Sequence, residues 1–96
     1  MSPGKLKKLI KLRKNLDNLD NSLIKLVKKR TEIVKKVLKL KEYKNQIVDK
    51  KRIKIILSKI KKESIKKNID PKITNRIWKN MIWSYIDYER RNFKKK

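Results

Sequence analysis

Two cations in the first half of the chain are placed where they could hold a small anion. Arg30 interrupts a row of apolar residues at a position that otherwise requires an apolar side chain. A buried and unpaired Arg costs several kcal/mol, so Arg30 must meet an anion or reach water. Lys41 follows eleven residues later, and the two side chains therefore project from nearly the same helix face, about 16 Å apart along the axis. Together they could bracket a dianion, although Arg30 could instead set helix register or form an interhelical ion pair.

Two further charged residues have less specific surroundings. Arg13 lies beside the same apolar row, 17 residues before Arg30. That separation is about 25 Å along a helix, so Arg13 could join the same ligand only from an antiparallel partner chain. An exposed surface Arg is the simpler interpretation. Glu89 ends an apolar stripe that begins at Trp78, and a carboxylate there is more typical of an exposed helix end than of a site.

The residue types exclude several kinds of chemistry. The 96-residue chain has no Cys and no His, which excludes disulfides, thiolate or imidazole metal sites and Cys/His or Ser/His catalytic pairs. Its single Gly, at position 4, leaves no glycine-rich phosphate loop. We therefore expect neither a metal nor a cofactor.

The net charge of +23 invites a nucleic-acid interpretation, but the charge is dispersed. Residues 1–48 carry a net charge of +11 and residues 49–96 carry +12. Half of the chain is Lys, Ile or Asn, the residues of A- and T-rich codons, so genome composition can supply much of this basicity. Nucleic acid is thus an unlikely partner except non-specifically, and a basic helical nucleic-acid-binding dimer remains an alternative.

The apolar row predicts one long first helix. From Leu9 to Leu40 its members alternate at spacings of three and four residues, with Arg30 as the exception. We expect a helix over residues 5–43, about 58 Å long. A compact monomer of this size is only about 30 Å across, so such a helix must pack on a partner, most simply in a homodimer.

Two shorter helices follow a turn at residues 43–46. Asp49 is a candidate N-cap for a helix over about 50–67, and Asp70 followed by Pro71 predicts another over about 71–92. No segment alternates as a strand. The expected fold is all-α: a single domain over residues 1–96, with long, short and medium helices in an intertwined homodimeric bundle. No apolar segment is long enough for a membrane span and no signal peptide is visible, so a cytoplasmic protein is expected.

These motifs resemble the all-helical chorismate mutases, a family of small dimeric enzymes. The segment from Leu9 to Leu26 is similar to the family pattern L-x-x-L-R-x-x-I-D-x-L-D-x-x-L-x-x-L, which the family follows with an Arg, here Arg30, and a downstream Lys, here Lys41. Asp49 to Arg52 is similar to the family's D-x-x-R, and the helix after Asp70 ends like the family's third helix. The resemblance covers residues 6 to about 90.

The resemblance implies a reaction without covalent catalysis. Chorismate would rearrange to prephenate by a concerted [3,3] shift, in the synthesis of phenylalanine and tyrosine. Catalysis of this kind rests on positioning and on electrostatic stabilisation of the transition state. The absence of His, Cys and any activated nucleophile is compatible with it.

The resemblance also implies roles for the four charged residues. Arg30, with Arg13 contributed across the dimer interface, would hold the substrate carboxylates through bidentate contacts. Lys41 would donate to the ether oxygen, where negative charge develops. Glu89 would donate a second hydrogen bond to that oxygen, for which its carboxyl group must be protonated.

Other positions of the resemblance concern the rest of the substrate. Arg52 would support the anionic site, and Asp49 would lie near the ring hydroxyl. Tyr85 occupies a substrate-binding position that the family commonly gives to a small polar residue, and Ile53 stands where the family usually has Glu. The loop between Lys41 and Arg52 is about one residue short. An isochorismate–pyruvate lyase of the same fold, or a mutase fold kept as a partner subunit, are therefore the alternatives.

Overall fold

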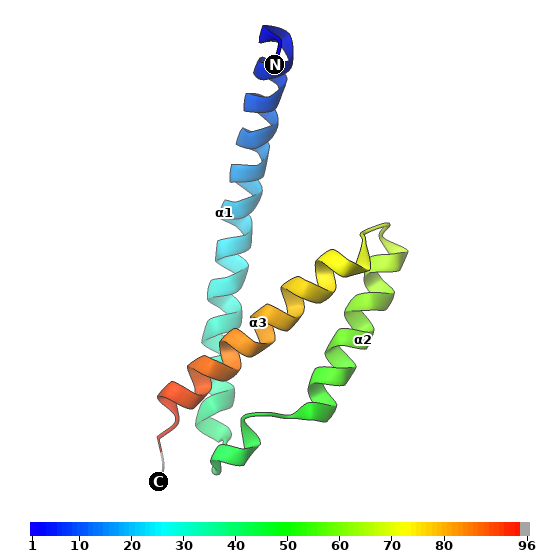
Figure 1. Cartoon of the computed structure of the whole chain (residues 1–96). Coiled ribbons are helices and arrows are strands. Elements are labelled where there is room, and N and C mark those ends of the chain that lie inside the picture. Colours follow the sequence, from blue (N-terminus) through cyan, green and yellow to red (C-terminus); the bar gives the residue numbers. More distant parts are fainter. Residues whose placement is uncertain (95–96) are drawn as a thin grey trace. The chain divides into compact units, whose positions relative to one another are not determined.

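The computed structural model describes residues 1–94 (Figure 1). In chain order these residues form α1 (Pro3–Leu40), the short 3-10 helix η1 (Lys44–Gln46), α2 (Lys50–Lys66) and α3 (Pro71–Asn92). No strand occurs in this range, so the predicted all-α class with long, short and medium helices is confirmed. The chain divides into two compact units, Met1–Ile33 and Val34–Lys96, and each is described by itself below.

The first helix begins earlier than expected. Pro3 is the first residue of α1. Proline is tolerated in the first turn because the backbone N–H that it lacks would have no hydrogen-bond partner within the helix there. The hydroxyl of Ser2 accepts a hydrogen bond from the backbone N–H of Lys5 at 3.3 Å and so satisfies one of the first-turn donors.

The first helix also ends earlier than expected, at Leu40 rather than at residue 43. In a longer helix the N–H groups of Glu42 and Tyr43 would bond to carbonyls four residues back. Both instead donate to the side-chain Oε1 of Gln46, at 2.7 and 2.9 Å. The expected extension to residue 43 is therefore wrong, because a side chain from beyond the helix captures its next two donors.

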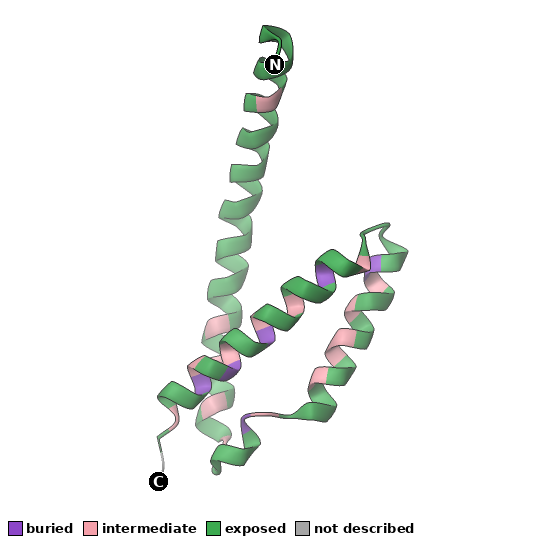
Figure 2. Cartoon of the chain, in the orientation of Figure 1, coloured by how far each residue is buried: buried purple, intermediate pink, exposed green. Residues whose placement is uncertain are grey.

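The apolar row on α1 is exposed in this chain. The helix contains no buried residue, and Figure 2 shows its N-terminal half almost entirely in the exposed class. Five of the leucines, each between 56% and 61% exposed, are Leu12, Leu16, Leu19, Leu23 and Leu26. An apolar surface of this length is typical of a site of protein–protein contact.

The core of the second unit joins three parts of the chain. Its buried residues are Ile47, from the loop after η1, and Ile82 and Ile86, from α3. Half-buried side chains from the loop, α2 and the end of α3 pack around them: Val48, Ile53, Ile56, Leu57 and Phe93. The loop between α1 and α2 is thereby anchored against the helical hairpin of α2 and α3.

The boundaries of α2 and α3 follow local signals. The carboxylate of Asp49 accepts from the N–H of Arg52 at 3.0 Å, and that of Asp70 accepts from the N–H of Lys72 at 3.0 Å. Both predicted N-caps are confirmed. The turn between the helices places Asn68 in the left-handed region, at φ 56°, where Asn is tolerated better than most residues. These signals position α2 and α3 within one residue of the expected ranges.

A buried hydroxyl pair holds the turn of this hairpin together. The Oγ of Ser64 on α2 and the Oγ1 of Thr74 on α3 lie 2.6 Å apart. The Ser64 hydroxyl also donates to the carbonyl of Ile60 at 2.6 Å. The Thr74 hydroxyl therefore donates across the pair, in preference to the carbonyl of Pro71 at 3.3 Å.

We expect Thr74→Val to lower the free energy of unfolding by about 1 kcal/mol, the usual contribution of such a hydrogen bond. Urea unfolding monitored by circular dichroism measures the change. Ser84→Ala is the matched control, because its exposed hydroxyl bonds only to the carbonyl of Asn80 on the same helix. Equal stability of the two variants would contradict a role for the hydroxyl pair.

Candidate functional site

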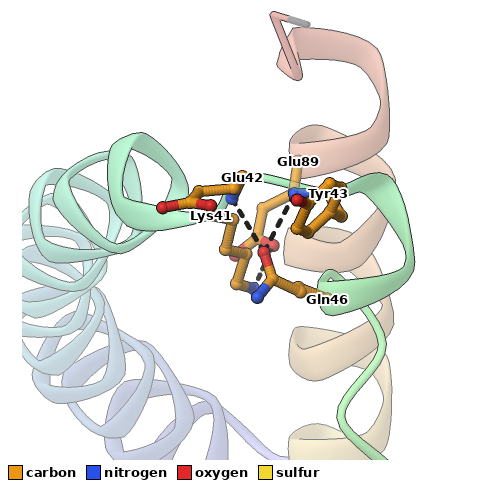
Figure 3. Close-up of polar contacts among 5 residues, drawn as sticks. All are labelled: Lys41, Glu42, Tyr43, Gln46 and Glu89. Carbon is orange, nitrogen blue, oxygen red and sulfur yellow. Dashed lines mark hydrogen bonds and ion pairs between the residues drawn. The ribbon is translucent and has the colours of Figure 1, made fainter. Parts of the chain in front are cut away.

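A short ion pair joins the end of α1 to α3 within the second unit. The Nζ of Lys41 lies 2.6 Å from Oε2 of Glu89, although 48 residues separate them in sequence. The two side chains are 19% and 8% exposed, so the pair is largely shielded from water. Figure 3 shows both side chains meeting beside the loop that follows α1. Charge-assisted hydrogen bonds of this kind are among the strongest that proteins make.

Glu89 does not lie at an exposed helix end, which its position at the end of the apolar stripe would more typically indicate. Glu89 is buried, on the same face of α3 as Ile82 and Ile86. The buried face of α3 therefore extends about one turn beyond its last buried apolar residue. Burying a carboxylate alone would be unfavourable, and Lys41 supplies the compensating charge.

A hollow of about 660 Å³ opens beside Lys41. Its walls combine one carboxylate, several cations and apolar side chains, contributed by the end of α1, the loop and the start of α2: Val37, Leu40, Asn45, Gln46, Val48, Asp49, Lys50 and Lys51. The hollow is largely open to solvent, so these residues alone would enclose only part of a bound small molecule. Asp49 and Lys41 thus line the same space.

Asp49, Arg52 and Tyr85 have different local settings. The carboxylate of Asp49 already accepts the N–H of Arg52, so it serves as the N-cap of α2 as well as lining the hollow. The Arg52 side chain is exposed on the first turn of α2. Tyr85 is half-buried on α3, one turn before Glu89.

Arg13 and Arg30 belong to the other unit. Both are exposed residues of α1 within Met1–Ile33. Within the second unit, the structure joins Lys41 to Glu89 and places Asp49 on the hollow that Lys41 lines. The part of the two arginines in the site stays a prediction.

The sequence-based interpretation missed Gln46. It treated residues 43–46 only as a turn, whereas the Gln46 side chain accepts two backbone donors directly after Lys41. The sequence carried only half of the signal: a Gln at the third position of a helical turn is typical of a capping box, but the N-cap residue here is Tyr43 and not a Ser or Thr.

Comparison with known proteins agrees with the resemblance in the sequence. A sequence model of the family described as chorismate mutase type II matches residues 12–90. The chain belongs to this family. All seven chorismate-binding candidates lie within the match, from Arg13 to Glu89. We find no match to this chorismate mutase type II chain among curated proteins or among solved structures.

The helices were also compared with the requirements of a bilayer. Within residues 1–94, no helix of this family member is both long enough and apolar enough to cross a membrane.

Proposed function

We propose that this chain is a chorismate mutase that rearranges chorismate to prephenate in phenylalanine and tyrosine synthesis. The observation that carries the proposal is the shielded pair of Lys41 and Glu89 in a chain of the chorismate mutase type II family. The pair puts an ammonium donor and a carboxyl group within one hydrogen bond of each other. One small acceptor atom of a substrate could therefore contact both.

The chemistry of the rearrangement fits a cationic site. As the ether C–O bond of chorismate breaks and the new C–C bond forms, negative charge gathers on the ether oxygen. An ammonium group already directed at that position stabilises the charge without reorganisation. Lys41 supplies this group, and its partial burial strengthens the interaction because water screens it poorly.

The two substrate carboxylates need separate partners. We assign them to Arg30 and to the partner subunit's Arg13, since a guanidinium group can bind a carboxylate through two parallel hydrogen bonds. Arg52 adds positive charge at the start of α2, and Asp49 lines the hollow where the ring hydroxyl would lie. Tyr85, which lies one turn before Glu89 on α3, is also assigned to substrate binding.

The homodimer is part of the same proposal. The leucines of α1 form an exposed apolar row on a helix that contains no buried residue. A second copy of α1 packed antiparallel would cover this row and bring its Arg13 toward Arg30 of the first copy.

Glu89 can serve the reaction in two ways. In the unliganded chain it accepts a hydrogen bond from Lys41. If it stayed ionised, it would only orient Lys41. If it takes up a proton, it can itself donate to the ether oxygen, and we assign it this second role.

We expect Glu89→Gln to remain active, because an amide N–H can donate to the ether oxygen in place of the protonated carboxyl group. The measurement is kcat with chorismate, with Asp87→Asn, which alters an exposed carboxylate on the same helix, as control. A large loss of kcat in Glu89→Gln would contradict the donor role and assign Glu89 to orienting Lys41 through its negative charge.

The direct test is the conversion of chorismate to prephenate by the purified protein. Turnover above the uncatalysed rate supports the proposal, and no turnover between pH 5 and 8 would overturn it. Isochorismate is the second substrate to assay. Ile53, half-buried against the core of α3 and the loop, offers no acceptor for a substrate hydroxyl, and this favours lyase activity as the alternative.

A further inference from the structure

The side chain of Gln46 organises the backbone directly after Lys41. Its Oε1 accepts the N–H of Glu42 at 2.7 Å and the N–H of Tyr43 at 2.9 Å (Figure 3). The Gln46 backbone N–H also donates to the carbonyl of Tyr43 at 3.0 Å. One residue thus closes the turn with both its side chain and its main chain.

These bonds fix Lys41 from its C-terminal side. The N–H of Lys41 itself donates to the carbonyl of Leu38 at 3.1 Å, which tightens the last turn of α1. The next N–H, of Glu42, is held by Gln46. The peptide groups on both sides of the Lys41 Cα are therefore restrained, and its side chain leaves the backbone in one direction.

Loss of the Gln46 acceptor would release donors that the helix can use. The free N–H groups of Glu42 and Tyr43 could return to carbonyls four residues back and extend α1 beyond Leu40. Lys41 would then adopt helical backbone angles in place of the loop conformation that directs its Nζ at Glu89. The acceptor atom, not the bulk of the side chain, prevents this extension.

The same loop is tied to the helix that carries Glu89. Ile47 follows Gln46 directly and is only 4% exposed, packed with Ile82 and Ile86 of α3. Glu89 lies less than one turn beyond Ile86. Gln46 therefore connects the backbone around Lys41 to the core that positions its partner carboxylate.

We propose that Gln46 is a positioning residue for Lys41: its amide oxygen ends α1 at Leu40 and so aims the ammonium group at the reacting ether oxygen. The inference rests on the proposed mutase function and adds a residue that touches no reacting atom. It differs from a purely structural role because its loss changes where Lys41 points.

The experiment compares three variants by steady-state kinetics with chorismate. Gln46→Met keeps the length of the side chain and removes the acceptor, and we expect kcat to fall about 10- to 100-fold. KM should change much less, because the carboxylate-binding arginines are elsewhere. Gln46→Glu keeps an acceptor oxygen and should restore kcat to near that of the unmodified protein. Lys44→Met, in the same turn with an exposed side chain, is the matched control and should leave kcat unchanged.

Backbone Cα and carbonyl chemical shifts supply a readout that does not depend on turnover. Those of Lys41, Glu42 and Tyr43 should move toward helical values in Gln46→Met and stay at loop values in Gln46→Glu, while the shifts of α3 change in neither variant. Unchanged kcat in Gln46→Met, or equal losses in Gln46→Met and Gln46→Glu, would overturn the inference while leaving the mutase proposal intact. An unmodified protein that makes no prephenate would overturn both, since Lys41 would then have no reaction to be positioned for.

Discussion

Lys41→Met is expected to lower kcat for prephenate formation by about 10²- to 10³-fold, the usual effect of removing one donor that stabilises developing negative charge. Met preserves most of the side-chain volume, so the loss reports the missing ammonium group. KM should change less than kcat, because the ether oxygen gains its charge only in the transition state. Steady-state kinetics measures both constants. Lys39→Met, which alters an exposed lysine on the last turn of α1, is the control and should behave like the unmodified protein.

A loss of activity in Lys41→Met could also reflect misfolding, since it leaves the carboxylate of Glu89 buried without its cation. Breaking a buried ion pair from one side is destabilising by up to a few kcal/mol, and less here because Lys41 retains some exposure. The double variant Lys41→Met with Glu89→Gln removes the stranded charge. We expect it to unfold at a urea concentration near that of the unmodified protein and to remain inactive. Activity equal to that of Glu89→Gln alone would show that Lys41 is not the donor.

The helix boundaries that depend on neighbouring residues could be read from the sequence. Asp49 and the Asp70-Pro71 pair bond to backbone groups two or three residues away, and such signals need no knowledge of the fold. The end of α1 was harder to predict. Its apolar row continues through Leu40, and the capture of the next donors by Gln46 depends on how the following turn folds back.

Burial of Glu89 could not be read from its own helix. The pattern on α3 is the same for a carboxylate at an exposed end and for one that faces inward. Lys41, 48 residues earlier, decides between them, because its positive charge compensates the cost of burying the Glu89 carboxylate. The resemblance to chorismate mutases indicated that these two residues act together, and the ion pair places them together physically.

The arginines raise a different problem. Spacing along α1 shows that Arg13 and Arg30 are too far apart to hold one small ligand from a single helix. It does not determine which surface faces them, because that depends on what covers α1. An exposed row of leucines indicates that something covers α1, and the pairing of the arginines follows only if the cover is an antiparallel α1.

A mixture of two inactive variants tests this arrangement. Arg13→Ala and Lys41→Met should each be nearly inactive alone, because each breaks both sites of its homodimer. After subunit exchange, a mixed dimer would contain one site with Lys41, Arg30 and the partner's Arg13 all intact. Half of the randomly formed dimers are mixed and each has one working site, so about a quarter of the unmodified activity should return.

The matched control is a mixture of Arg30→Ala with Lys41→Met. Each site takes its Arg30 and its Lys41 from the same chain. In this mixed dimer, one site therefore lacks Arg30 and the other lacks Lys41, and activity should stay absent. Exchange is verified by carrying different affinity tags on the two variants and purifying the doubly tagged species, which should show about half of the unmodified activity for the Arg13 mixture, because every dimer is then mixed. Recovery in the Arg13 mixture alone requires that residue to act across the interface. If neither mixture recovers although doubly tagged dimers form, each chain completes its own site and α1 of the partner serves only to cover the leucines.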